Sequence, residues 1–412
     1  MEIYNLITII IVLAALFSYI NFRYIKLPGT IGIMVLSLVT SLIIVNIGFF
    51  YPDFFKKTTH LIGTLDFNTA LMKVMLGFLL FAGAIHIDIN EMKNERAAII
   101  TFSTIGVLLS TFIVAGLFYA VTYWLGFSIG FIYCLLFGAL ISPTDPIAVL
   151  GILKQAKIPS TLEVKISGES LFNDGVAVVV FITIYEIITA GPQNVNLLQI
   201  VWLFIKEAGG GLAFGLLLGY IGFWALRSIN NYVVEVLITL AIVMGGYLFA
   251  AYLHVSGPLA MVMAGIITGN KSRAEGMSDS SEDYIDKFWE IIDEIFNAIL
   301  FLLIGFEMLI VPFTWMFFWL GCITVVIVLL ARLVSVAIPV LFLKPVKTFE
   351  RNAIPILTWG GLRGGISVAL ALSLPKSMFS EVFVSVTYIV VLFSIIVQGL
   401  TIGKFAKKLA RL

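Results

Sequence analysis

The chain alternates long apolar runs with short polar breaks along almost its whole length. Most of the runs are about twenty residues long, which is what a helix needs to cross the hydrocarbon core of a bilayer. Hydrophobic residues make up 60% of the 412 positions and charged residues only 12%, and the mean hydropathy is +1.09. A soluble domain of this size could not cover itself with so few polar side chains. The sequence therefore predicts an all-α polytopic membrane protein.

We expect about thirteen transmembrane helices. They form a single transmembrane unit over residues 1–403, which a short basic tail follows at 404–412. The first run, MEIYNLITIIIVLAALF, has no basic segment before it, so it predicts a mature span rather than a cleaved signal. The ninth span is short enough to be re-entrant. The predicted spans are 3–21, 30–51, 68–88, 97–125, 128–153, 161–190, 197–226, 232–253, 257–270, 287–311, 314–343, 351–374 and 381–403.

Lysine and arginine are concentrated in alternate loops. The loops after odd-numbered spans carry basic residues such as Arg23, Lys93 and Arg273, while the even-numbered ones carry little. By the positive-inside rule, this predicts an N-terminus outside and a cytoplasmic C-terminus, in the cell (inner) membrane. The net charge of +1 and the lack of a large basic patch predict no nucleic-acid partner.

Two spans combine helix-breaking residues with a charge. Span 128–153 contains LISPTDPIAVL, in which Pro143 and Pro146 should open the helix around Asp145. Span 351–374 contains TWGGLRGGISVALALSLP, in which glycines surround Arg363. The two charges can neutralise the helix ends that such breaks create. One discontinuous helix in each half predicts an inverted-repeat secondary transporter.

The stretch GESLFNDGVAVVV places two carboxylates inside the sixth span. Glu169 and Asp174 are costly there unless each faces a cavity or a partner. An acid beside a guanidinium stays ionised, whereas a desolvated acid without one can take up a proton. Arg332 and Arg363 are both candidate partners. We assign Glu169 to an arginine pair and Asp174 to an exchange site for a cation and a proton.

Neutral oxygen groups accompany Asp174. Ser170 and Asn173 share its helix face, because residues three or four apart lie on one side of a helix. The hydroxyl of Thr144 and the carbonyls freed by the break can join them. Oxygen ligands suit hard cations, so we expect Na⁺ to bind at Asp174, Ser170 and Thr144.

Four motifs resemble the signatures of a known family. ISPTDPIAV, GESLFNDGVAVV, the arginine of ARLVSVAIP and GGLRGGISVALALSLP resemble those of the monovalent cation/proton antiporters, the bacterial sodium/proton antiporters related to animal sodium/proton exchangers. The resemblance covers nearly the whole chain. It implies a homodimer in which each protomer has core-domain helices at about 97–190 and 314–403, and dimerisation or scaffold helices at about 1–88 and 197–311. The two discontinuous helices, spans 5 and 12, would cross within the core.

The resemblance also implies roles for individual residues. The cation and proton site falls on Asp174, Asn173, Ser170 and Thr144, the structural ion pair on Glu169 and Arg332, and the crossing-helix charges on Asp145 and Arg363. The Asn-Asp pair resembles the electroneutral branch, which implies one proton per cation. Where several archaeal relatives carry an acid in span 3, this chain has Ala82.

The leading interpretation is a secondary active antiporter that exchanges Na⁺ or Li⁺ for H⁺ by alternating access in the membrane lipid, without a cofactor and without enzymatic activity. A K⁺/H⁺ or mixed-cation antiporter is an alternative, because oxygen ligands alone do not separate these ions. A gated cation channel is an alternative from another class, although a single asymmetric carboxylate site disfavours it. An intramembrane aspartyl protease would need Asp145 and Asp174 to share a proton, and the chain lacks a GxGD arrangement.

Overall fold

The structure is a computed structural model of the chain. It describes residues 2–63, 67–145, 153, 159–191, 196–275, 279–311, 314–344, 349–350 and 352–410. Within these residues all regular structure is helical, which confirms the predicted all-α class. The helices of the first half are α1 (Glu2–Ile20), α2 (Gly29–Phe50), α3 (Pro52–Gly63), α4 (Phe67–Thr69), α5 (Leu76–Ile85), α6 (Ile89–Thr101), α7 (Val107–Trp124), α8 (Phe131–Ile141) and α10 (Ser160–Ala190). Those of the second half are α11 (Leu197–Arg227), α12 (Tyr232–Tyr252), α13 (Gly257–Glu275), α14 (Asp279–Glu307), α15 (Trp315–Leu343), α16 (Ala353–Trp359), α17 (Gly365–Leu372), α18 (Ser380–Phe393) and α19 (Gly399–Ala410).

Short π-helical or 3₁₀ segments join several of these helices. Among the described residues, 9 helical segments are long and apolar enough to cross a membrane. They are Tyr4–Ile25, Gly29–Phe50, Phe67–Ile85, Ile89–Trp124, Ser160–Ala190, Leu198–Arg227, Tyr232–Tyr252, Trp315–Leu343 and Ser380–Leu409. The remaining predicted spans coincide with the shorter α8, the more polar α13 and α14, and the interrupted pair α16 and α17. The count of thirteen therefore stays a prediction.

Two boundaries differ from the expectation. The predicted external loop after span 2 contains α3, whose first turn holds Asp53, a favourable charge at a helix N-terminus. The fourth span begins earlier than predicted, at Ile89, because the Asp88 side chain accepts the backbone N–H of Asn90 and caps the helix there.

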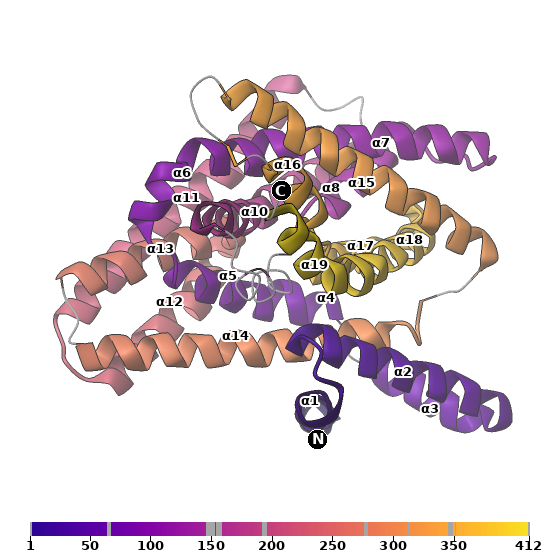
Figure 1. Cartoon of the computed structure of the whole chain (residues 1–412), viewed down its shortest axis with the longest axis horizontal. Coiled ribbons are helices and arrows are strands. Elements are labelled where there is room, and N and C mark those ends of the chain that lie inside the picture. Colours follow the sequence, from indigo (N-terminus) through magenta and orange to yellow (C-terminus); the bar gives the residue numbers. More distant parts are fainter. Residues whose placement is uncertain are drawn as a thin grey trace.

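The carboxylate-bearing helix α10 lies at the centre of the molecule. It packs against α6, α8, α11 and α13, and α14 runs below it in the view of Figure 1. Helices α11, α12 and α13 lie towards one end of the molecule, and α7 and α18 towards the other (Figure 1). The side chains of the GESLFND segment are therefore surrounded by protein rather than by lipid.

A stripe of glycines joins α11 to α13. A side chain at Gly211 would meet the backbone of Ser256, one at Gly215 the carbonyl of Ala260, and one at Gly219 the side chain of Ile267. Small residues at this spacing allow helices to approach closely in membranes. These contacts lie within one chain, so the stripe positions α13 against α11.

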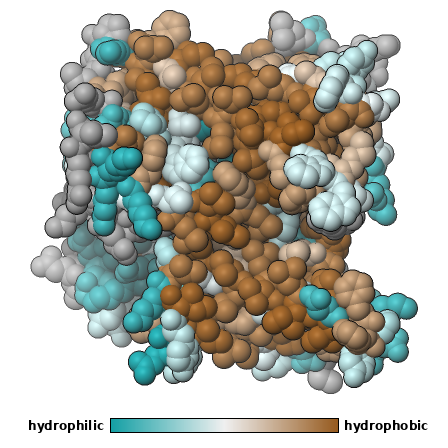
Figure 2. All heavy atoms as spheres, turned by 45° about the vertical axis from the view of Figure 1, so that its right-hand side comes forward, coloured by the Kyte–Doolittle hydropathy of each residue, from teal (hydrophilic) through white to brown (hydrophobic). Residues whose placement is uncertain are grey.

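The outer surface suits a lipid environment. Figure 2 shows a broad hydrophobic face with hydrophilic residues gathered towards its edges. The tryptophans Trp124 and Trp315, at helix ends, are 84% and 70% exposed. Tryptophan at helix ends is typical of the interface between membrane and water.

Candidate functional site

The glycine-rich span is interrupted, as its sequence predicts. Helix α16 ends at Trp359 and α17 begins at Gly365, with irregular backbone between them. Added Cβ atoms would lie 2.4 Å from Nε of Arg332 at Gly361 and 2.3 Å from Oδ2 of Asp145 at Gly364. Only glycine leaves room for these two charged side chains beside the break.

A second irregular segment lies against the first. Helix α8 ends at Ile141, and residues 142–145 are not helical. The N–H of Asp145 donates to the carbonyl of Leu362 at 2.7 Å, and Arg363 donates to the carbonyls of Ser142 and Pro143. The two breaks thus give partners to each other's backbone groups, which the membrane interior requires. Pro146, the second proline expected at the break, lies outside the described residues.

The two charges at the breaks face helix ends of opposite sign. The Asp145 side chain lies against Gly364, which precedes the N-terminus of α17. Arg363 binds carbonyls at the C-terminus of α8. An anion at an N-terminus and a cation at a C-terminus both interact favourably with the helix dipole. Asp145 and Arg363 are the two charges that the sequence analysis assigned to the breaks.

Three neutral side chains from the predicted ion site contact one another. The amide of Asn173 donates to Thr144 Oγ1 at 2.6 Å and accepts the Thr144 backbone N–H at 3.3 Å. The hydroxyls of Thr144 and Ser170 are 3.2 Å apart. All three side chains are buried. The break in the fifth span is therefore held against the middle of α10.

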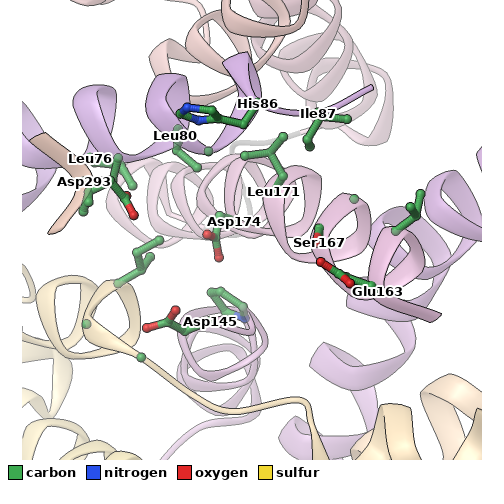
Figure 3. A pocket seen from close by; sticks show the side chains of 18 of the residues that line it. Leu76, Leu80, His86, Ile87, Asp145, Glu163, Ser167, Leu171, Asp174 and Asp293 are labelled. Atoms are coloured by element: carbon green, nitrogen blue, oxygen red, sulfur yellow. The ribbon is translucent and has the colours of Figure 1, made fainter. Parts of the chain in front are cut away.

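Asp174 lies one turn after Ser170 and faces a cavity of about 810 Å³. It is 7% exposed, and it makes no hydrogen bond within the described part of the chain. Asp145 lines the same cavity, and the two carboxylates point into one space (Figure 3). Like charges that share a poorly solvated space repel each other, so a cation or proton bound there lowers the energy.

Glu169, by contrast, is fully paired. Both of its oxygens accept hydrogen bonds from Arg332, the second at 3.0 Å, and Glu169 is 1% exposed. Arg332 also donates to the carbonyl of Leu357. Of the two candidate arginines, the structure thus brings Arg332 to Glu169, while Arg363 binds the end of α8. Bidentate pairing of this kind fixes geometry as well as charge.

The cavity exposes groups that the sequence did not single out. Its lining includes Glu163 and Ser167 of α10, Asp293 and Glu290 of α14, and Ser367 of α17. Helix α14 has polar residues at helical spacing, namely Asp286, Glu290, Asp293 and Asn297. This periodicity could have revealed a polar face on α14. Among the described residues no group of three or more His, Cys, Asp or Glu side chains could hold a metal ion together.

Comparison with known proteins shows the family of the chain. A family described as "Sodium/hydrogen exchanger, transmembrane" matches residues 11–408. The chain is 48% identical over 410 residues to the Na⁺/H⁺ antiporter NhaP of Pseudomonas aeruginosa, covering 98% of this chain and 96% of that protein. It is 30% identical over 392 residues to the Na⁺/H⁺ antiporter NhaH of Halobacillus aidingensis, covering 94% and 93%.

The fold is shared with a solved structure. The sodium proton antiporter MjNhaP1 from Methanocaldococcus jannaschii superimposes with a TM-score of 0.78 over 99% of each chain, at 20% sequence identity. At this identity the similarity concerns the arrangement of the helices.

Proposed function

Because the chain belongs to the transmembrane sodium/hydrogen exchanger family, we propose that it exchanges Na⁺ for H⁺ across the membrane by alternating access, with Asp174 binding the cation and the proton in turn. The family consists of secondary transporters, not enzymes, which disfavours the channel and excludes the protease considered from the sequence. Li⁺ is expected to substitute for Na⁺, and the gradients themselves drive exchange without a cofactor.

The observation that carries the proposal is the environment of Asp174. Its carboxylate is buried and faces the cavity. The contacting side chains of Ser170, Asn173 and Thr144 come from the same part of α10 and from the break packed against it. A cation with these oxygens, or a proton on the carboxylate, neutralises the charge. A bare carboxylate is costly to move through the membrane interior, so only the loaded site crosses, which makes transport an exchange rather than a leak.

The remaining predicted residues support this site. We propose that the Glu169–Arg332 pair keeps α10 against α15 and α16 without titrating during transport, and that Asp145 and Arg363 stabilise the crossing of the two interrupted helices. In this account one proton is exchanged per cation. The moving core comprises residues 97–190 and 314–403. The other helices form the dimerisation scaffold of a homodimer.

The cavity also suggests which side is open. Its exposed rim includes Glu91 and Ser160, next to loops that the positive-inside rule assigns to the cytoplasm. We therefore propose an inward-facing state in the cell membrane, with the N-terminus outside and the C-terminus in the cytoplasm.

Proteoliposomes loaded with a pH-sensitive dye test this function. An external pulse of Na⁺ or Li⁺ should alkalinise the lumen when the cation enters, and a voltage imposed with K⁺ and valinomycin should leave the rate unchanged. A K⁺ pulse in separate vesicles without valinomycin tests the mixed-cation alternative. A strongly voltage-dependent rate would contradict one-for-one exchange, and cation flux without proton movement would contradict antiport itself.

A further inference from the structure

The cavity holds a third carboxylate that the exchange site does not use. Asp293 of α14 is half-buried and lines the cavity. Its carboxylate is directed into the cavity from the wall beside Leu76, on a different side from Asp145 (Figure 3). Asp293 and Asp145 interact electrostatically, as do Asp145 and Asp174. The three acids therefore share one electrostatic environment.

Two buried acceptors lie on α14 and on α17, which packs against α14. The Asn297 side chain, one turn further along α14, interacts with Asp293 and is 2% exposed. Its amide oxygen has no hydrogen-bond partner among the described residues. On α17, the Ser367 residue also lines the cavity, is fully buried, and has a hydroxyl without a partner in the described ranges. Buried polar atoms without partners are costly, and a cation or one of its waters satisfies such oxygens.

The arrangement suits a hydrated ion rather than a bare one. Asp293 comes from α14 and Asp174 from α10, and Figure 3 shows them at different places around the cavity, so they would act at separate positions. The cavity of about 810 Å³ has room for a cation with several waters, since each water takes roughly 30 Å³.

We infer that Asp293, with Asn297 and Ser367, forms a second cation-binding station that holds a hydrated Na⁺ ahead of Asp174. The inference rests on the proposed function, because it adds a step to the same cation pathway. The station concentrates Na⁺ next to the exchange site, where Asp174 remains the group that releases the exchanged proton. Its loss should weaken the apparent affinity for Na⁺ and leave the maximal rate almost unchanged.

Sodium binding to the purified full-length protein tests the station without transport. The excess ²³Na NMR linewidth reports weakly bound Na⁺. Asp174→Asn protein should retain part of this linewidth, and Asp174→Asn/Asp293→Asn protein should lose most of what remains. Equal linewidths for these two proteins, with melting temperatures close to that of the unsubstituted protein, would overturn the inference. Failure of the proposed function looks different, because Asp174→Asn protein would then still exchange Na⁺ for H⁺.

Transport kinetics supply a second test. Asp293→Asn should raise the KM for Na⁺ by about fivefold, the effect of one nearby charge in a partly solvated site, with a maximal rate within about twofold of the unsubstituted protein. Glu290→Gln removes the same charge from the exposed rim of the same helix and should raise the KM by less than about twofold. Equal effects of the two substitutions would contradict the station, because Asp293 would then contribute only general negative charge to the cavity. An unchanged KM in Asp293→Asn would also contradict it.

Discussion

Glu169 and Asp174 are both almost completely buried on one helix, little more than a turn apart. Arg332 binds both oxygens of Glu169, whereas Asp174 faces the cavity and has no hydrogen-bond partner in the described residues. The same chemical group therefore has two different surroundings. We expect the first to contribute to stability and the second to transport.

Replacing Asp174 with asparagine tests the transport role. The amide keeps the size of the side chain but can neither bind a proton at physiological pH nor carry the charge that attracts Na⁺. We expect exchange in proteoliposomes to fall below detection, with a change in unfolding free energy smaller than about 1 kcal/mol. A correctly folded Asp174→Asn protein with full exchange activity would contradict the assignment.

Replacing Glu169 with alanine tests the stability role. The substitution leaves the Arg332 guanidinium buried without its carboxylate, which costs about 3–5 kcal/mol. Thermal unfolding in detergent should show a large fall in melting temperature for Glu169→Ala, and a comparable fall for Arg332→Ala. If Glu169→Ala and Asp174→Asn melted at the same temperature, the two carboxylates would not differ as proposed.

The sequence predicted some of these residues better than others. Helical spacing alone placed Glu169, Ser170, Asn173 and Asp174 on one polar face. It left the arginine partner of Glu169 open. Arg332 and Arg363 both lie within apolar spans, and the position of a residue along a span does not show in which direction around the helix axis its side chain points. Asp293 was missed because acids near the start of a span also occur where a helix meets the headgroups.

At the scale of helices, the contact between α11 and α13 depends on glycine. A Cβ added at Gly215 would lie 2.3 Å from the backbone carbonyl of Ala260, which cannot move aside like a side chain. Gly215→Ala should therefore destabilise the protein by about 1–3 kcal/mol.

Gly209 provides a matched control on the same helix. A Cβ there meets nothing closer than 4.0 Å, and alanine favours a helix over glycine by up to about 1 kcal/mol. Gly209→Ala should leave the melting temperature unchanged or raise it slightly. A destabilisation equal to that of Gly215→Ala would show that the close packing is not the cause.

A buried lysine connects α6, α10 and the segment before α16. Lys165 is 1% exposed, lies 3.0 Å from Glu350 and 3.5 Å from Glu95, and stands 5.0 Å from the centroid of the Phe349 ring. Burial alone would raise the pKa of Glu350, but the hydrogen bonds from Thr161 and Lys165 and the lysine charge hold it below its ordinary value of 4.5.

This depressed pKa gives a pH dependence with a defined sign. A carboxyl group whose pKa is lower in the folded state contributes stability above its unfolded pKa, and that stability is lost as the pH falls through the folded value. The melting temperature should therefore fall as the pH drops below about 4.5. Glu350→Gln should melt lower near neutral pH and show a shallower fall in acid. Parallel curves for the two proteins would exclude Glu350 as a contributor.

For the whole molecule, the all-helical membrane fold follows from composition and the length of the apolar runs, and the comparisons confirm it. The cavity could not be predicted, because it forms where α5, α10, α14 and α17, distant in sequence, come together. Periodicity describes which face of a helix is polar, but not which other helix completes that face.

Competition between Na⁺ and H⁺ at Asp174 is the central claim, and proton release on binding tests it most directly. Isothermal titration of the purified protein with Na⁺, in buffers of different ionisation enthalpy, measures how many protons leave per cation bound. We expect a heat that depends on the buffer and corresponds to about one proton per Na⁺, and this dependence should disappear in Asp174→Asn protein. Na⁺ binding to the unsubstituted protein with a buffer-independent heat at every pH would contradict the claim.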